Sequence, residues 1–201
     1  MIPQLLIAAS FVLASIQDVR ERAVHDLVWI PAVIGGILAV SSQYPSLVFP
    51  LAKVGLIGAI AFAFVFFGLV GEADGIALAL ISTDPGQFSP IFPLFGAAAI
   101  ALCHIGYEFS VGNARGTPTV PLEKFLQEQR WIPKAIVDGE ARTEVTGDVN
   151  DARDEVQAKA KPGSSVVVSY GVPTVAYLGA GYVAYLVLML ILRQAPLVSF
   201  P

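Results

Sequence analysis

Long runs of apolar residues fill most of the chain outside one polar stretch. A helix needs about 20 mainly apolar residues to cross the hydrocarbon core of a membrane. Five runs come close to this length or exceed it: residues 2–17, 27–44, 49–70, 91–109 and 172–192. The pattern therefore predicts an all-α polytopic membrane protein.

The segment Asp74–Thr83 is the ambiguous element, because its apolar part is short for a span. It lies between the third run and the turn signal Asp84-Pro85-Gly86. If it crosses and the N-terminus is outside, ten of the twelve Lys and Arg residues lie in the cytoplasm. If it does not cross, the better orientation gives nine of the twelve. The positive-inside rule thus favours about six transmembrane helices.

A polar stretch separates the fifth span from the last one. Of the 28 charged residues, 18 fall between Glu108 and Lys161. We expect residues 1–111 to form the membrane domain with spans one to five. Residues 112–165 are expected to form a cytoplasmic charged loop or small subdomain, and residues 166–201 the last span and a C-terminal tail.

Within the polar stretch, the pattern predicts three kinds of local structure. Residues 121–136 are typical of a small unit with an amphipathic helix, whose apolar side carries Leu122, Phe125, Leu126 and Trp131. Residues 138–161 look solvated or disordered. Residues 166–168, three valines, are typical of a short strand.

Composition supports the membrane assignment. The chain is 55% hydrophobic and 14% charged, with a mean hydropathy of +0.70, whereas a soluble domain carries about 25% charged residues. A net charge of −4 gives no basic face for nucleic acid. One cysteine excludes an internal disulfide and a Cys-x-x-Cys zinc site. No basic residue precedes Leu5, so we interpret the first run as a retained span, not a cleaved signal peptide.

Asp74 is the main candidate for chemistry, because it interrupts the apolar stretch from Phe49 to Ile81, together with Glu72. A carboxylate at the centre of a span costs about 2.5–3.5 kcal/mol on insertion scales, so such groups usually have a function. The alternative is that Glu72 and Asp74 mark an interface between the third and fourth segments.

Asp18 is the second candidate. Taken alone, it could terminate the first helix or pair with Arg20 or Arg22. However, two crossings separate it from Asp74, so both carboxylates belong at the same membrane face. Two adjacent carboxylates share a proton and titrate jointly. The ionised member can take a proton from water while the protonated one donates to a carbonyl oxygen.

The run Gly71-Glu72-Ala73-Asp74 resembles the Gly-x-Gly-Asp signature of intramembrane aspartyl proteases. With an aspartate at the end of the first span, the chain is similar to the prepilin peptidase family. The closer similarity is to its archaeal prepilin and prearchaellin (preflagellin) peptidases, which use Gly-x-Ala-Asp as a variant. Tyr170-Gly171-Val172-Pro173, at the start of the last span, is similar to a Pro-Gly-Ile-Pro stretch in that family.

The resemblance implies that Asp18 and Asp74 are the catalytic dyad, supported by Gly71, Glu72 and Ala73. It implies an aspartic endopeptidase without cofactor or metal, which removes leader peptides at the cytoplasmic face of the cell membrane. Its partners are archaellin or type IV pilin-like precursors, with a basic leader before a hydrophobic helix. The chain differs from many relatives at Ile76, where they have a basic residue. Bacterial members add a Cys-x-x-Cys metal site and N-methyltransferase activity, and we expect neither here.

Other candidate residues have less support. His104 and Glu108 share a helix face and could supply two metal ligands, but a hydrogen-bonded pair is the simpler interpretation. Cys103 is expected to be a small core residue. Glu21, Asp26 and Glu72 are candidates for an acidic rim that receives a basic leader. Gly-x-Ser-x-Gly and His-Glu-x-x-His motifs are both missing from the sequence, which argues against serine hydrolases and common zinc proteases.

Two other function classes remain as alternatives. The first is a small ion or proton transporter or channel with Asp74 and Glu72 as the ion site. The second is a non-catalytic scaffold whose loop recruits a soluble partner. A transporter predicts polar residues along several spans and an inverted repeat, and the sequence shows neither clearly.

Overall fold

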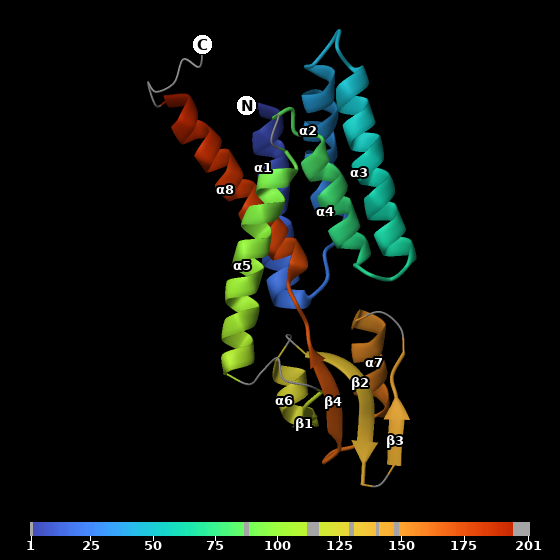
Figure 1. The fold of residues 1–201 in the computed structure, drawn as a ribbon. Helices are drawn as coiled ribbons and strands as arrows, with labels where there is room; N and C mark the ends of the chain where they lie inside the picture. Colours follow the sequence, from blue (N-terminus) through green and yellow to red (C-terminus); the bar gives the residue numbers. More distant parts are fainter. Residues whose placement is uncertain are drawn as a thin grey trace. The chain divides into compact units, whose positions relative to one another are not determined.

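The structure, a computed structural model, describes residues 2–86, 89–111, 117–128, 131–139, 141–146 and 149–194. Most of these residues are helical, and the part of the chain that follows the helix over Ile91–Ser110 and precedes the one over Thr174–Gln194 forms a small sheet (Figure 1). The elements in chain order are α1 (Ile2–Glu21), η1 (Asp26–Trp29), α2 (Ile30–Ser41), α3 (Val48–Phe66), α4 (Glu72–Ser82), α5 (Ile91–Ser110), β1 (Thr119–Pro121), α6 (Leu122–Gln127), β2 (Trp131–Asp138), β3 (Ala141–Glu144), α7 (Val149–Lys159), β4 (Ser165–Tyr170) and α8 (Thr174–Gln194).

The chain divides into two compact units. The helical unit comprises Met1–Ile16, Val24–Ala101 and Thr174–Pro201. The sheet unit comprises Gln17–Ala23 and Leu102–Pro173. The last turn of α1 and the second half of α5 are therefore grouped with the sheet unit.

Four helices among the described residues are long and apolar enough to span a membrane: α1, α3, α5 and α8. The helix over Asp26–Ser41 is apolar but shorter. At a rise of 1.5 Å per residue, the 11 residues of α4 extend about 16 Å, roughly half of the hydrocarbon core. The four long helices are what a membrane protein requires, and they lie where the apolar runs predicted them.

Glycines bring the helices of the helical unit into close contact. A Cβ at Gly35 of α2 would lie 2.7 Å from the main-chain oxygen of Pro3, and one at Gly36 would lie 3.0 Å from Oγ1 of Thr83. The start of α1 and the end of α4 therefore both lie beside the middle of α2. In Figure 1, α1 and α4 run in opposite directions, so α1 runs toward the end of this unit at which α4 begins.

The interior of the helical unit is aromatic, and its outer surface is apolar. The ring of Phe11 lies 5.7 Å from that of Trp29 and 5.5 Å from that of Tyr182, and all three side chains are buried. Large apolar side chains also point outward, such as Phe62, which is 71% exposed. An apolar surface of this extent is unfavourable in water and is expected against lipid.

The sheet unit contains a four-stranded antiparallel sheet in the order β1-β4-β2-β3. Val166 and Val168 of β4 pack with Phe125 of α6 and Val156 of α7 in its core. The expectation of an all-α protein is therefore wrong for this part of the chain, whereas the predicted strand at residues 166–168 is confirmed within β4.

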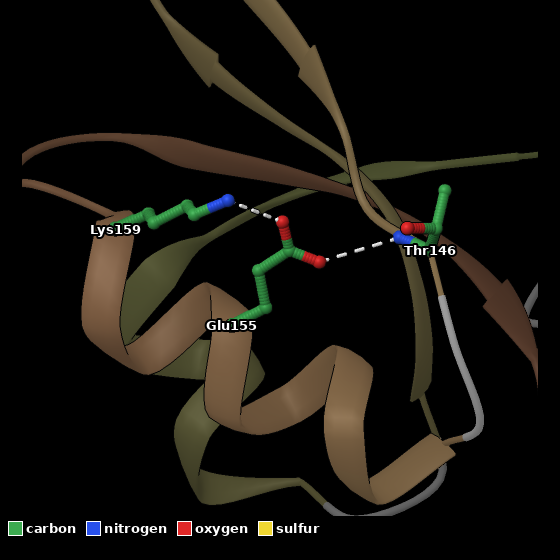
Figure 2. Close-up of polar contacts among 3 residues, drawn as sticks. All are labelled: Thr146, Glu155 and Lys159. Carbon is green, nitrogen blue, oxygen red and sulfur yellow. Dashed lines mark hydrogen bonds and ion pairs between the residues drawn. The ribbon is translucent and has the colours of Figure 1, made fainter.

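Two local predictions in the sheet unit are also corrected. Trp131, predicted on the apolar side of a helix, begins strand β2. The pairing of β2 with β4 is irregular between Pro133 and Ala135. This irregularity lets Pro133 occupy an inner strand. Residues 138–161 were predicted to be solvated or disordered; their described residues are mostly exposed, but they form the ordered elements β3 and α7, so only the disorder is wrong. Glu155 of α7 accepts hydrogen bonds from the Lys159 ammonium at 2.6 Å and from the Thr146 amide at 3.3 Å, which attaches α7 to the segment after β3 (Figure 2).

Candidate functional site

The motif residues form the first turn of α4. Gly71 precedes the helix with an extended backbone (φ −71°, ψ 160°), and Asp74 is the third helical residue. The amide of Gly71 donates to Oδ2 of Asp74 at 3.2 Å, so the carboxylate satisfies one of the donors that helix starts leave without a helical partner. Gly71 and Glu72 are exposed, while Ala73 and Asp74 are half-buried. Asp74 therefore lies at a boundary, with its carboxylate next to an exposed helix end.

Gly75 determines how closely this turn approaches α3. It is buried, and a Cβ there would lie 2.5 Å from Cγ2 of Val65. The resemblance named Gly71, Glu72 and Ala73 as the residues that support Asp74, but Gly75 makes the close helix contact. The signal was present in the sequence as a glycine directly after the motif aspartate.

Asp18 lies in the last turn of α1 and is 8% exposed. The amide of Arg22 donates to its main-chain oxygen at 3.2 Å, and Nη1 of Arg22 lies 3.4 Å from the same oxygen. Arg22 has a positive φ of 56°, a conformation typical of residues that close a helix. A carboxylate buried to this degree is rarely left without partners.

Asp18 is grouped with the sheet unit, and the four motif residues are in the helical unit. The pairing of the two carboxylates thus stays a prediction.

No family model matches this chain, and neither does any curated protein or solved structure. The functional interpretation therefore depends on the residues themselves.

Asp84 is a buried carboxylate whose sequence context predicts only a turn. It is 2% exposed and follows the end of α4. Its Oδ2 accepts a hydrogen bond from the Tyr182 hydroxyl at 3.0 Å, and its Oδ1 accepts one from the Gly86 amide at 2.8 Å. The Tyr185 hydroxyl lies 3.5 Å from Oδ1, and Nζ of Lys53 donates to the main-chain oxygen of Asp84 at 2.6 Å. Asp84 therefore connects α3, the end of α4 and α8 within the helical unit.

The remaining candidates are in α5. Nε2 of His104 lies 3.4 Å from Oε1 of Glu108, and Glu108 is buried. This supports the interpretation of a polar pair within one helix. Cys103, predicted to be a core residue, is exposed, so that prediction is wrong. Within the described part of the chain, no three His, Cys, Asp or Glu residues are grouped to hold a metal ion.

Proposed function

We propose that this chain is a membrane-embedded aspartic endopeptidase that cleaves precursor proteins at the cytoplasmic membrane face, with Asp18 and Asp74 as its catalytic pair. The observation that carries the proposal is the Gly-x-Ala-Asp turn at the start of α4, where a half-buried carboxylate adjoins an exposed helix end. An ionisable residue that interrupts an apolar stretch is costly in a membrane, so such residues usually have a function.

The order of the helices along the chain supports a common membrane edge for the two carboxylates. Asp18 lies in the last turn of α1, and Asp74 lies in the first turn of α4. In a six-span topology, which is part of the proposal, α2 and α3 each cross once, so an even number of crossings separates the two residues.

The proposed reaction needs one ionised and one protonated carboxyl group. The ionised carboxylate takes a proton from water, and the water oxygen attacks the carbonyl carbon of the scissile peptide bond. The other carboxyl group donates its proton to the carbonyl oxygen. When the tetrahedral intermediate collapses, the carbon–nitrogen bond breaks, the amide nitrogen leaves with the proton that the first carboxylate took from water, and the second carboxyl group regains its proton from the hydroxyl oxygen. The products are a new carboxyl end and a new amine.

The proposed substrates are archaellin or type IV pilin-like precursors with a basic leader and a hydrophobic helix. The exposed carboxylate of Glu72, next to the motif aspartate, supports a preference for a basic leader. Methyl transfer is not part of the proposed activity.

Co-expression with such a precursor tests the proposal. Wild type should produce the electrophoretic shift that loss of the leader causes, and Asp18→Asn and Asp74→Asn should each lower the cleavage rate by at least about a hundredfold. Glu123→Gln, which changes an exposed carboxylate of α6, is the matched control and should cleave like wild type. Membrane levels of all four proteins are compared by immunoblot. Normal cleavage by either asparagine variant would exclude the dyad.

The transporter alternative has less support from the site. Glu72 is exposed, and Asp74 accepts a hydrogen bond from the amide of Gly71, so the two groups do not resemble an enclosed ion site. A proton or cation flux in liposomes that Asp74→Asn removes, without any precursor cleavage by wild type, would favour the transporter.

A further inference from the structure

A cavity of about 340 Å³ lies beside Asp84 in the helical unit, and neither Asp18 nor Asp74 lines it. Its walls are mainly apolar and include Leu5 of α1 and Leu186 and Met189 of α8. Its polar groups come from Asp84, Gln4 and Tyr185. The cavity thus combines an apolar body with a small polar end, as small-molecule sites do.

The polar end of the cavity presents hydrogen-bond acceptors. The Asp84 carboxylate has about four acceptor positions, and the three donors around it, from Gly86, Tyr182 and Tyr185, leave at least one open. Oε1 of Gln4 is buried and has no hydrogen-bond partner within the described part of the chain. A buried acceptor without a partner costs free energy, so a ligand that donates to it is favoured.

The charge of the residues that line the cavity indicates the charge that a ligand must carry. Asp84 is the charged residue among those that line it. The nearby ammonium of Lys53 donates to the main-chain oxygen of Asp84, and Lys53 does not itself line the cavity. A cationic donor therefore fits this end, and an anion does not. A divalent metal is a poor fit, because such ions need several oxygen ligands and one carboxylate is present.

The rim of the cavity is apolar and accessible. Leu5 is 61% exposed and Leu190 is 40% exposed, on helices long and apolar enough to span the membrane. A ligand with an apolar body can thus enter from the bilayer. A quaternary ammonium carries no N–H to donate to Gln4 or Asp84, whereas a primary ammonium carries three.

We propose that this cavity binds the primary ammonium group of an amphipathic molecule, with the head group against Asp84 and Gln4 and the apolar body against α1 and α8. Two sources share this chemistry: a lipid with an ethanolamine head group and a free long-chain amine. The proposal is independent of the proteolytic function.

The test uses the full chain in nanodiscs of phosphatidylcholine with or without phosphatidylethanolamine, and mass spectrometry of the lipid that stays bound after purification. Wild type should enrich phosphatidylethanolamine over phosphatidylcholine, relative to the surrounding bilayer. Gln4→Leu should lower this enrichment about tenfold, because it removes an acceptor for a charged donor. Dodecylamine should compete with the lipid.

Leu190→Trp and Ile191→Trp form a matched pair on α8. Both positions are exposed, but Leu190 lines the cavity and Ile191 does not, so Leu190→Trp should lose the enrichment and Ile191→Trp should keep it. Dodecylamine binding that Leu190→Trp removes, without lipid enrichment, would support the site and assign it to a free amine. The proposal would be overturned if wild type bound neither phosphatidylethanolamine nor dodecylamine in preference to phosphatidylcholine. It would also be overturned if neither Leu190→Trp nor Gln4→Leu changed the binding of these amines.

Discussion

A charged residue in an apolar environment requires hydrogen-bond partners, and Asp84 in the helical unit is an example. Asp84 is buried, and the transfer of a charge from water costs several kcal/mol unless hydrogen bonds compensate. The Gly86 amide, two residues along the chain, and the Tyr182 hydroxyl, 98 residues along, supply this compensation. The stability of the unit should therefore depend on these donors as well as on apolar packing.

Removal of one donor to Asp84 is expected to destabilise the protein. Tyr182→Phe keeps the buried ring but leaves Oδ2 of Asp84 without the Tyr182 hydroxyl, which should cost about 1–3 kcal/mol. The thermal unfolding midpoint in detergent measures the effect. Tyr107→Phe, at an exposed position of α5, is the control and should leave the midpoint unchanged. An equal midpoint for Tyr182→Phe and wild type would contradict this role of the hydroxyl.

Glu155 provides a pH-dependent contact in the sheet unit (Figure 2). The hydrogen bond from the Lys159 ammonium, and then that from the Thr146 amide, lower the pKa of this carboxyl below its ordinary value of 4.5. The contact therefore stabilises the attachment of α7 above pH 4.5 and is lost as the pH falls through the lowered pKa. Glu155→Gln should reduce hydrogen-exchange protection of residues 141–146 at neutral pH. The difference from wild type should disappear in acid, and a difference that grew in acid would have the wrong sign.

At the scale of elements, the close contact of α3 and α4 depends on Gly75. Gly75→Val places a side chain against Val65, so we expect a loss of about 1–3 kcal/mol and a displaced first turn of α4. The unfolding midpoint and the rate of precursor cleavage should both fall. Gly58→Val is the matched control, since a Cβ at Gly58 of α3 meets no atom within 4 Å. Similar losses in both variants would indicate a general effect of β-branched residues in the helices.

The long helices could be predicted from the sequence, whereas of the sheet only part of β4 could. Apolar runs at 49–70 and 91–109 predicted α3 and α5 nearly to their ends, because a span must be continuously apolar. In β2, the irregular pairing near Pro133 interrupts the alternation that identifies a strand, and all four residues of β3 are exposed. In α7, Ala152 and Val156 are the buried residues of a charged segment, too few for a clear periodic pattern.

At the scale of the whole molecule, the motif aspartate could be identified from the sequence, but the contacts between distant helices could not. A carboxylate within an apolar run is visible in the sequence, so Asp74 stood out. The role of Asp84 depends on Tyr182, which is 98 positions away, and no local pattern links the two. Pairs this distant form only when helices pack, so a single sequence does not reveal them.

The topology gives the final prediction, because the proposed reaction needs both aspartates at one membrane face. In a Cys103→Ala background, Leu69→Cys samples the turn before α4, Glu144→Cys samples strand β3, and Ser42→Cys samples the turn after α2; all three positions are exposed. The bias of Lys and Arg toward the cytoplasm predicts that a membrane-impermeant maleimide labels the first two from the cytoplasmic side and Ser42→Cys from the opposite side.

Inside-out and right-side-out vesicles distinguish these sides. Labelling of Leu69→Cys from the side opposite Glu144→Cys would place the start of α4 away from the cytoplasm. Leader peptides emerge on the cytoplasmic side, so Asp74 would then be inaccessible to them. That result would exclude the proteolytic proposal. It would not affect the proposed ammonium-binding cavity beside Asp84, because that proposal depends only on contacts within the helical unit.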